Sequence, residues 1–201
     1  IPLKFRSVPR MNRSYQPPML RAGTLIRGWA ASTVIGAQYA SRRIRELWKT
    51  DHLGVLRLSA TALAPVADAA SAARLAGDRA GAEHWVAVGE PLVTSAREAV
   101  GAFRKAVGDM GVEAVAWLAR VEAEAARLRG DAAPELWQAA VDGFSFGHVY
   151  EQARSRWRLA EAFLATGDRA GAAQQAQAAH EVAGRRGAAP AAAAVEALVQ
   201  R

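Results

Sequence analysis

Apolar residues in the last three quarters of the chain recur at the spacing of amphipathic helices rather than strands. Alternating Val, Ile, Thr and Tyr, the pattern of a strand, is nearly absent from residues 51–201. Forty-four of these 151 residues are Ala, which has the highest helix propensity. The clearest helical face, within residues 110–129, carries Val115, Leu118, Val121, Ala125 and Leu128. The pattern predicts an all-α fold for residues 51–201.

Glycine, aspartate and proline positions divide this region into helices. We expect helices, in chain order, at residues 53–76, 80–107, 110–129, 135–146, 149–166, 169–185 and 191–200. Asp51 should cap the first helix, and Pro134 should lie in the first turn of the fourth. Pro65 should kink or split the first helix, and Pro91 should lie near a kink in the second, because proline lacks an amide donor.

The string Gly-Asp-Arg-Ala-Gly-Ala occurs twice, at residues 77–82 and 167–172, each time between two Ala-rich helical patterns. Such repetition is typical of helical-hairpin repeats. We expect each first glycine to adopt a positive φ, each aspartate to cap the next helix and each arginine to be solvated. A phosphate cradle at the helix N-terminus is the less favoured interpretation of the same residues.

Small and large residues alternate on the facing sides of the second hairpin. Leu159, Ala160 and Phe163 share one face of its first helix, and Ala172, Ala176 and Ala179 share one face of its second helix. Small residues allow close helix packing, and the larger ones fill the space between hairpins. We therefore predict tetratricopeptide-like antiparallel helical hairpins stacked into a short superhelix, in which the units differ in length.

Charge is distributed unevenly along the chain. Residues 1–50 contain 10 Lys and Arg against one acidic residue, whereas residues 51–201 contain 16 basic and 18 acidic residues. The first segment is basic and poorly patterned, so we treat it as a separate unit that could contact a polyanion. The candidate contacts are seven of its eight arginines: Arg10, Arg13, Arg21, Arg27, Arg42, Arg43 and Arg45. A loose helix-turn-helix pattern at residues 26–48 is a weaker interpretation, and a solvated or disordered segment is favoured over a specific DNA reader.

Residues 51–201 resemble the helical region of the large ATP-dependent LuxR-type transcriptional regulators of actinobacteria and of related signal-transduction ATPases. The resemblance lies in residues 150–188, in Glu135-Leu136-Trp137 and in Glu113-Ala114-Val115-Ala116-Trp117. It implies a tetratricopeptide-like sensor region that follows an ATPase domain and precedes a DNA-binding helix-turn-helix. No GxxxxGK[ST] string is present, so ATPase activity, if any, would lie in a domain absent from this chain.

Residues 1–50 do not fit this resemblance. They are rich in Arg, Ser, Pro and Gln without a helical period. Two explanations stay open: the segment is read in a different frame of a GC-rich gene, or it is a genuine basic extension.

Few residues suggest a specific site. Trp157 lies between arginines at positions 154 and 158, so we predict a groove or partner contact at Trp157, Arg154 and Arg158. A Trp that fills the space between Ala-rich helices is the alternative, and the favoured one for any single Trp. The four histidines have no metal-ligand or catalytic spacing, and Cys is absent, so we predict no catalytic, cofactor-binding or metal residues.

The sequence therefore predicts a non-catalytic, cytoplasmic scaffold or sensor that binds a protein partner or a small effector in its helical groove. An exposed end face would favour self-association. No apolar run reaches about 18 residues, so we expect no membrane contact. The alternative is a small nucleic-acid-binding protein that uses residues 1–50, with the helical region as an oligomerisation module.

Overall fold

The computed structural model describes residues 32, 35–36, 39, 46 and 51–185. From residue 51 to residue 185 the chain is helical, without strands, which confirms the all-α prediction for this range. The elements are α2 (His52–Leu75), α3 (Arg79–Val107), α4 (Val112–Arg129), α5 (Pro134–Gly143), the 3-10 turn η1 (Phe144–Phe146), α6 (Val149–Thr166) and α7 (Arg169–Arg185). The helix predicted at residues 191–200 lies outside the described residues.

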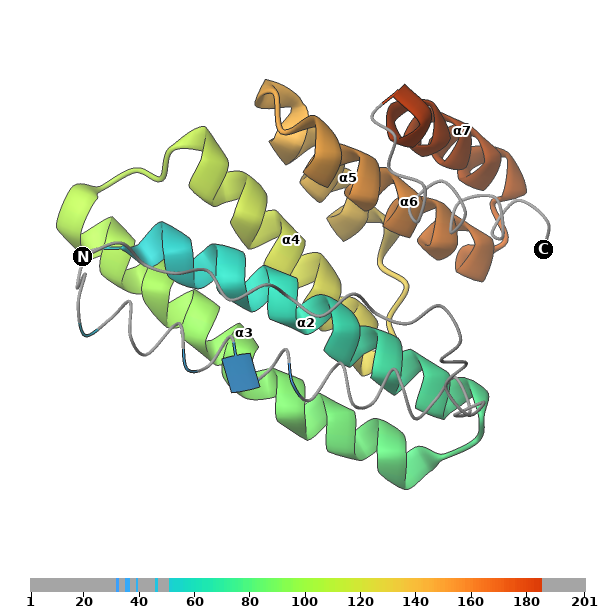
Figure 1. The fold of residues 1–201 in the computed structure, drawn as a ribbon, viewed down its shortest axis with the longest axis horizontal. Helices are drawn as coiled ribbons and strands as arrows, with labels where there is room; N and C mark the ends of the chain where they lie inside the picture. Colours follow the sequence, from blue (N-terminus) through green and yellow to red (C-terminus); the bar gives the residue numbers. More distant parts are fainter. Residues whose placement is uncertain (1–31, 33–34, 37–38, 40–45, 47–50, 186–201) are drawn as a thin grey trace, which may run out of the picture.

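The helices pack as antiparallel neighbours in chain order. The long helices α2 and α3 lie side by side, and α4 packs on both (Figure 1). The short α5 lies between α4 and α6, and α7 pairs with α6. Helix α2 therefore buries its apolar face against both α3 and α4, whereas the helices after α4 pack on their neighbours in the chain.

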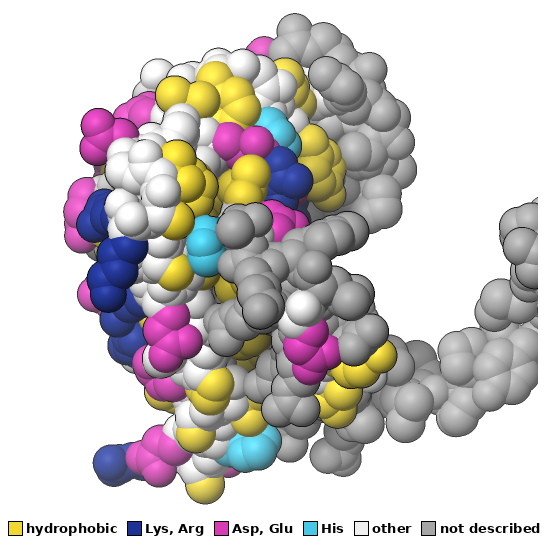
Figure 2. Space-filling model, turned by 90° about the vertical axis from the view of Figure 1, so that its left-hand side faces the viewer, with side chains coloured by type: hydrophobic (Ala, Val, Ile, Leu, Met, Phe, Trp, Pro, Cys, Tyr) yellow, Lys and Arg dark blue, Asp and Glu magenta, His cyan; other side chains and the backbone are white. Residues whose placement is uncertain are grey.

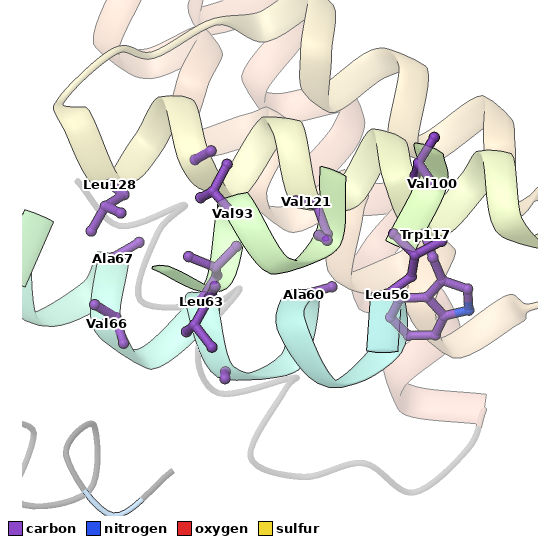
Figure 3. Packing of buried hydrophobic residues seen from close by; sticks show 14 of the residues in the cluster. Leu56, Ala60, Leu63, Val66, Ala67, Val93, Val100, Trp117, Val121 and Leu128 are labelled. Carbon is purple, nitrogen blue, oxygen red and sulfur yellow. The ribbon is translucent and has the colours of Figure 1, made fainter. Parts of the chain in front are cut away.

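The largest part of the core lies between α2, α3 and α4. Leu63 and Val66 of α2, Val93 of α3, and Val121 and Leu128 of α4 are almost completely buried. Figure 3 shows these side chains converging from the three helices. A second cluster joins α4 to α5 and α6. Its members include three almost completely buried residues, Ala123, Trp137 and Leu159.

Neither proline splits its helix. Pro65 lies inside α2 and Pro91 inside α3, and both helices are continuous. The prediction that Pro65 could divide its segment is thus wrong on that point. Pro65 is buried, and packing of α2 against two helices offsets the one backbone hydrogen bond that proline cannot donate.

The two copies of the repeated string build the same turn. Gly77 has φ of 70° and Gly167 has φ of 88°. Asp78 Oδ1 accepts from the amide of Gly81 at 2.8 Å, and Asp168 Oδ1 accepts from the amide of Gly171 at 2.9 Å. The predicted glycine and capping roles are confirmed.

The cap geometry also explains the second glycine of the string. A Cβ added at Gly81 would lie 2.2 Å from Asp78 Oδ2, and one added at Gly171 would lie 2.4 Å from Asp168 Oδ2. The capping carboxylate therefore covers the position where any other residue would place its side chain. The predicted cap of α2 has the same spacing, since Asp51 Oδ1 accepts from the amide of Gly54 at 2.8 Å.

Two details of the predicted helices differ from the structure. Val115 is 50% exposed, so it does not belong to the buried face assigned to α4. Helix α4 lies between α2 and α3 on one side and α5 and α6 on the other, and it buries residues on most of its circumference rather than on one stripe. Helix α5 ends at Gly143 and continues as a 3-10 turn, instead of running to Phe146.

Helix α2 passes the length and hydropathy test for a membrane span. Of its most apolar window, 67% is buried inside the fold, which is typical of the core helix of a soluble protein. Its apolar surface already has partners in α3 and α4.

Candidate functional site

A network of arginines and carboxylates lies where α2, α4 and α6 meet. Glu124, in α4, is completely buried, and both of its carboxylate oxygens accept hydrogen bonds from arginines. Oε1 accepts from Arg120 Nε at 3.1 Å and Nη2 at 2.9 Å, and Oε2 accepts from Arg127 Nε at 2.9 Å and Nη2 at 2.7 Å. Positions 120, 124 and 127 share one helical face, so α4 itself brings the three side chains together.

The two arginines connect α4 to the neighbouring helices. Arg127 donates from Nη1 to Asp68 Oδ1 of α2 at 2.6 Å. Arg120 donates from Nη1 to Ser155 Oγ of α6 at 3.2 Å, and its guanidinium carbon lies 5.1 Å from the ring centroid of Trp137 in α5. Side-chain contacts from one buried cluster thus reach three other helices.

Arg158 of α6 completes the network. Its side chain is 7% exposed, and it donates from Nη2 to Asp68 Oδ1 at 2.7 Å and from Nη1 to Glu161 Oε2 at 2.7 Å. The single oxygen Asp68 Oδ1 therefore accepts from Arg127 and Arg158, which belong to different helices. Asp68 is the residue of α2 that links α4 with α6.

The charges in the network stabilise one another. Burial alone would raise the pKa of Glu124, but the charges of Arg127, Arg120 and Arg158 outweigh burial and lower this pKa from its ordinary 4.5 to about 2. Burial acts to lower the pKa of Arg158, but the carboxylates of Glu161, Asp68 and Glu124 outweigh it and raise the pKa. Both groups stay charged at neutral pH.

Positive and negative charges in the network are equal in number. Four arginines pair with four carboxylates, and the members are Arg120, Arg127, Arg154, Arg158, Asp68, Glu124, Glu151 and Glu161. Ion pairs of this network join α4 to α2 and to α6, and α2 to α6. Within the part of the chain described, no group of three or more His, Asp or Glu side chains could hold a metal ion.

A second polar cluster lies at the N-terminal ends of α4 and α6. Glu113 pairs with Arg57 of α2, and His148 Nε2 lies 3.4 Å from Glu113 Oε1. Burial acts to raise the pKa of Glu113. The hydrogen bond from Arg57 is the largest of the effects that oppose burial, and together these effects lower the pKa of Glu113. The ring of His148 lies 5.3 Å from the ring of Phe146 and 6.2 Å from that of Trp117, between centroids. Polar contacts of Glu113 thus join α4 to α2 and to His148, the N-cap residue of α6, at this end as well.

The structure brings Trp157 and Arg158, two of the three predicted groove residues, into contact. The guanidinium carbon of Arg158 lies 4.3 Å from the ring centroid of Trp157, and Arg154 lies one turn before Arg158 in α6. Arg158 is buried and both of its terminal nitrogens bind carboxylates, so it acts first as a link between helices. Trp157 is partly buried against the alanines of α7, which agrees with the space-filling alternative. A partner contact at these residues stays a prediction.

The remaining candidate residues of the sequence analysis are the arginines of residues 1–50 and the histidines. The seven arginines proposed as polyanion contacts, and most of the window at residues 26–48, lie outside the described residues. Among the histidines, His52 packs on Phe103 and His84 on Trp85, with ring centroids 6.2 and 5.3 Å apart. Neither contact suggests acid–base chemistry.

Comparisons with known proteins give no assignment. No protein-family model matches the sequence, and no curated protein matches it significantly.

Sequence reasoning missed the buried network. One signal was present, because Arg120, Glu124 and Arg127 follow the i, i+4, i+7 spacing of a single helical face. Charged residues at this spacing usually belong to a solvated face. Only the packing of α2 and α6 against α4 shows that this face is internal.

Proposed function

We propose that residues 51–201 form a non-catalytic, tetratricopeptide-like scaffold that binds a protein partner or a small effector. Such a region would serve as the sensor part of a bacterial signal-transduction ATPase or LuxR-type regulator, in the cytoplasm. The observation that carries the proposal is the repeated string, which builds the same turn between α2 and α3 as between α6 and α7. Repetition of a hairpin is the rule for stacked helical scaffolds.

The distribution of polar groups supports a scaffold. Within residues 51–185, the buried Arg120 and Glu124 pair with each other in α4, and the ion pairs of Asp68 join α2 to α4 and to α6, so these charges position helices. In this proposal, a ligand shifts the population between arrangements of the helical stack, and neighbouring domains respond to that shift.

Sequencing the gene on both sides of this segment, in all three forward frames, tests the proposal. We expect Ala-rich repeats and a GxxxxGK[ST] loop upstream, and a helix-turn-helix downstream. An open frame that starts shortly before Ile1 and stops after Arg201 would overturn the regulator assignment. An upstream frame that carries Ala-rich repeats would also explain residues 1–50 as a frame artefact.

The alternative is a small nucleic-acid-binding protein, favoured by the excess of nine positive charges in residues 1–50. Its affinity for DNA or RNA should fall steeply with salt concentration, because cationic side chains release condensed counterions. Comparison of the full chain with residues 51–201 separates the two functions. Binding lost on truncation supports the alternative, whereas partner binding that survives truncation supports the scaffold.

A further inference from the structure

One edge of the Arg158 guanidinium is only half occupied. The Nε and Nη2 donors of an arginine lie side by side on one edge, where they can bind a single carboxylate together. Within residues 51–185, four arginines use both donors of this edge on one glutamate: Arg97, Arg120, Arg127 and Arg129. In Arg158, Nη2 donates to Asp68, whereas the buried Nε has no acceptor. An unpaired donor on a buried cation is costly, so this edge favours an additional acceptor.

Asp68 fits this edge poorly because one of its oxygens is shared by two arginines. Its Oδ1 atom accepts from Arg158 Nη2 at 2.7 Å and from Arg127 Nη1 at 2.6 Å. The Asp68 side chain reaches Arg158 from another helix, and it is 33% exposed. A free carboxylate is not attached to α2, so it can place one oxygen on Nε and the other on Nη2 of Arg158. Asp68 is thus an internal ligand, and a carboxylate from solution can compete with it.

The surroundings of Arg158 favour a small acid over an acidic protein surface. Asp68 and Glu161 bind its two terminal nitrogens, and both carboxylates are partly exposed. They would repel a partner that carries several acidic groups close together. In the view of Figure 2, Lys and Arg side chains likewise lie among those of Asp and Glu, so acidic groups border the basic ones on that face too. A small ligand with a single carboxylate therefore suits the site best.

We infer that the Nε–Nη2 edge of Arg158 binds the carboxylate of a small organic acid, and that Asp68 is its internal competitor. The bound carboxylate accepts from both donors and displaces Asp68, while Arg127 keeps its pairing with Glu124. Asp68 is the residue of α2 that binds Arg158 of α6, so its displacement releases this contact between the two hairpins. The inference rests on the proposed function, because it names the ligand class and the contact through which an effector shifts the helical stack.

An NMR titration of the full chain with sodium acetate tests the site, with sodium chloride used to hold the ionic strength constant. The Nε–H resonance of Arg158 is assigned by through-bond correlations, so this measurement needs no variant. We expect acetate to shift the resonance, with a dissociation constant of roughly 1–30 mM, as for so small a ligand. A resonance that does not move up to about 100 mM acetate overturns the inference.

Two matched variants separate displacement of Asp68 from the loss of a nearby negative charge. Asp68→Asn and Glu161→Gln each neutralise a carboxylate that binds Arg158, and the two carboxylates are equally exposed. Asp68→Asn should tighten acetate binding at least about fivefold, because it weakens the internal competitor. Glu161→Gln should change the affinity by no more than about twofold, as expected for one partly exposed charge.

Equal tightening in the two variants, or none in Asp68→Asn, overturns the inference. Either result leaves the scaffold proposal standing, because the sequence of the gene on both sides of this segment decides that proposal independently.

Discussion

Asp68 and Arg158 lie 90 residues apart, at equivalent positions of the two hairpins, and bind each other. The repeated strings begin at Gly77 and Gly167, so the same offset aligns Asp68 of α2 with Arg158 of α6. Arg158 Nη2 lies 2.7 Å from Asp68 Oδ1. The first helices of the two hairpins therefore face one another across α4, and opposite charges at one repeat position join them.

Acid should weaken the fold through Glu124. Because its pKa is lowered from 4.5 to about 2, its contribution is fully present above about pH 5 and is lost as the pH falls towards 2. The shift corresponds to a stabilisation on the order of 3 kcal/mol at neutral pH. Urea unfolding between pH 7 and pH 3 should show decreasing stability. Glu124→Gln should take up about one proton fewer on unfolding in acid, so its stability should fall less between pH 7 and pH 3. A pH dependence equal to that of the unaltered protein would contradict this role.

The two repeated caps should contribute equally to stability. Asp78→Ala and Asp168→Ala each remove the acceptor of an amide in the first turn of α3 or α7. Each variant should lose about 1 kcal/mol, as is usual for an aspartate cap. Chemical denaturation measures both losses. An effect confined to one of the two variants would show that the copies are not equivalent in energy.

Two glycines should respond to alanine in opposite directions. A Cβ at Gly143 would lie 2.9 Å from the Cα atom of Ala116, so Gly143→Ala should force α5 away from α4 and cost roughly 1–3 kcal/mol. Gly101 lies inside α3 with nothing within 4 Å of an added Cβ. Gly101→Ala should therefore stabilise the protein by about 0.5–1 kcal/mol. Thermal melting of the two variants should shift in opposite directions, and shifts of the same sign would be inconsistent with this packing.

Local signals in the sequence determined most of the helices. The predicted bounds of α6 and the predicted start of α7 agree with the structure, because a Gly-Asp turn separates the two helices and both are rich in Ala. The stop of α5 at Gly143 was missed because Phe144 and Phe146 extend an apolar pattern. A tertiary contact accompanies the end of this helix: the ring of Phe144 packs on that of Trp117 in α4, with ring centroids 5.1 Å apart.

The candidate sites could not be predicted in the same way. Arg154, Trp157 and Arg158 were recognised as a group, but the burial of Arg158 depends on Asp68, 90 residues earlier in the chain. Likewise, Val115 fits a helical stripe, yet it is exposed. Helix α4 buries residues on most of its circumference, so its buried positions do not follow a single stripe. Contacts between distant elements decide both cases, and local periodicity contains no information about them.

A double-mutant cycle on Asp68 and Arg158 tests most directly whether the two hairpins form one coupled unit. The single variants Asp68→Asn and Arg158→Met and the double variant should give a coupling energy of at least about 1 kcal/mol in urea unfolding. Arg79 and Glu83 are the control pair, since their side chains are 91% and 67% exposed. That pair should couple by no more than about 0.5 kcal/mol. Coupling of Asp68 and Arg158 no greater than in the control would contradict the account, because the two hairpins would then be joined without this contact.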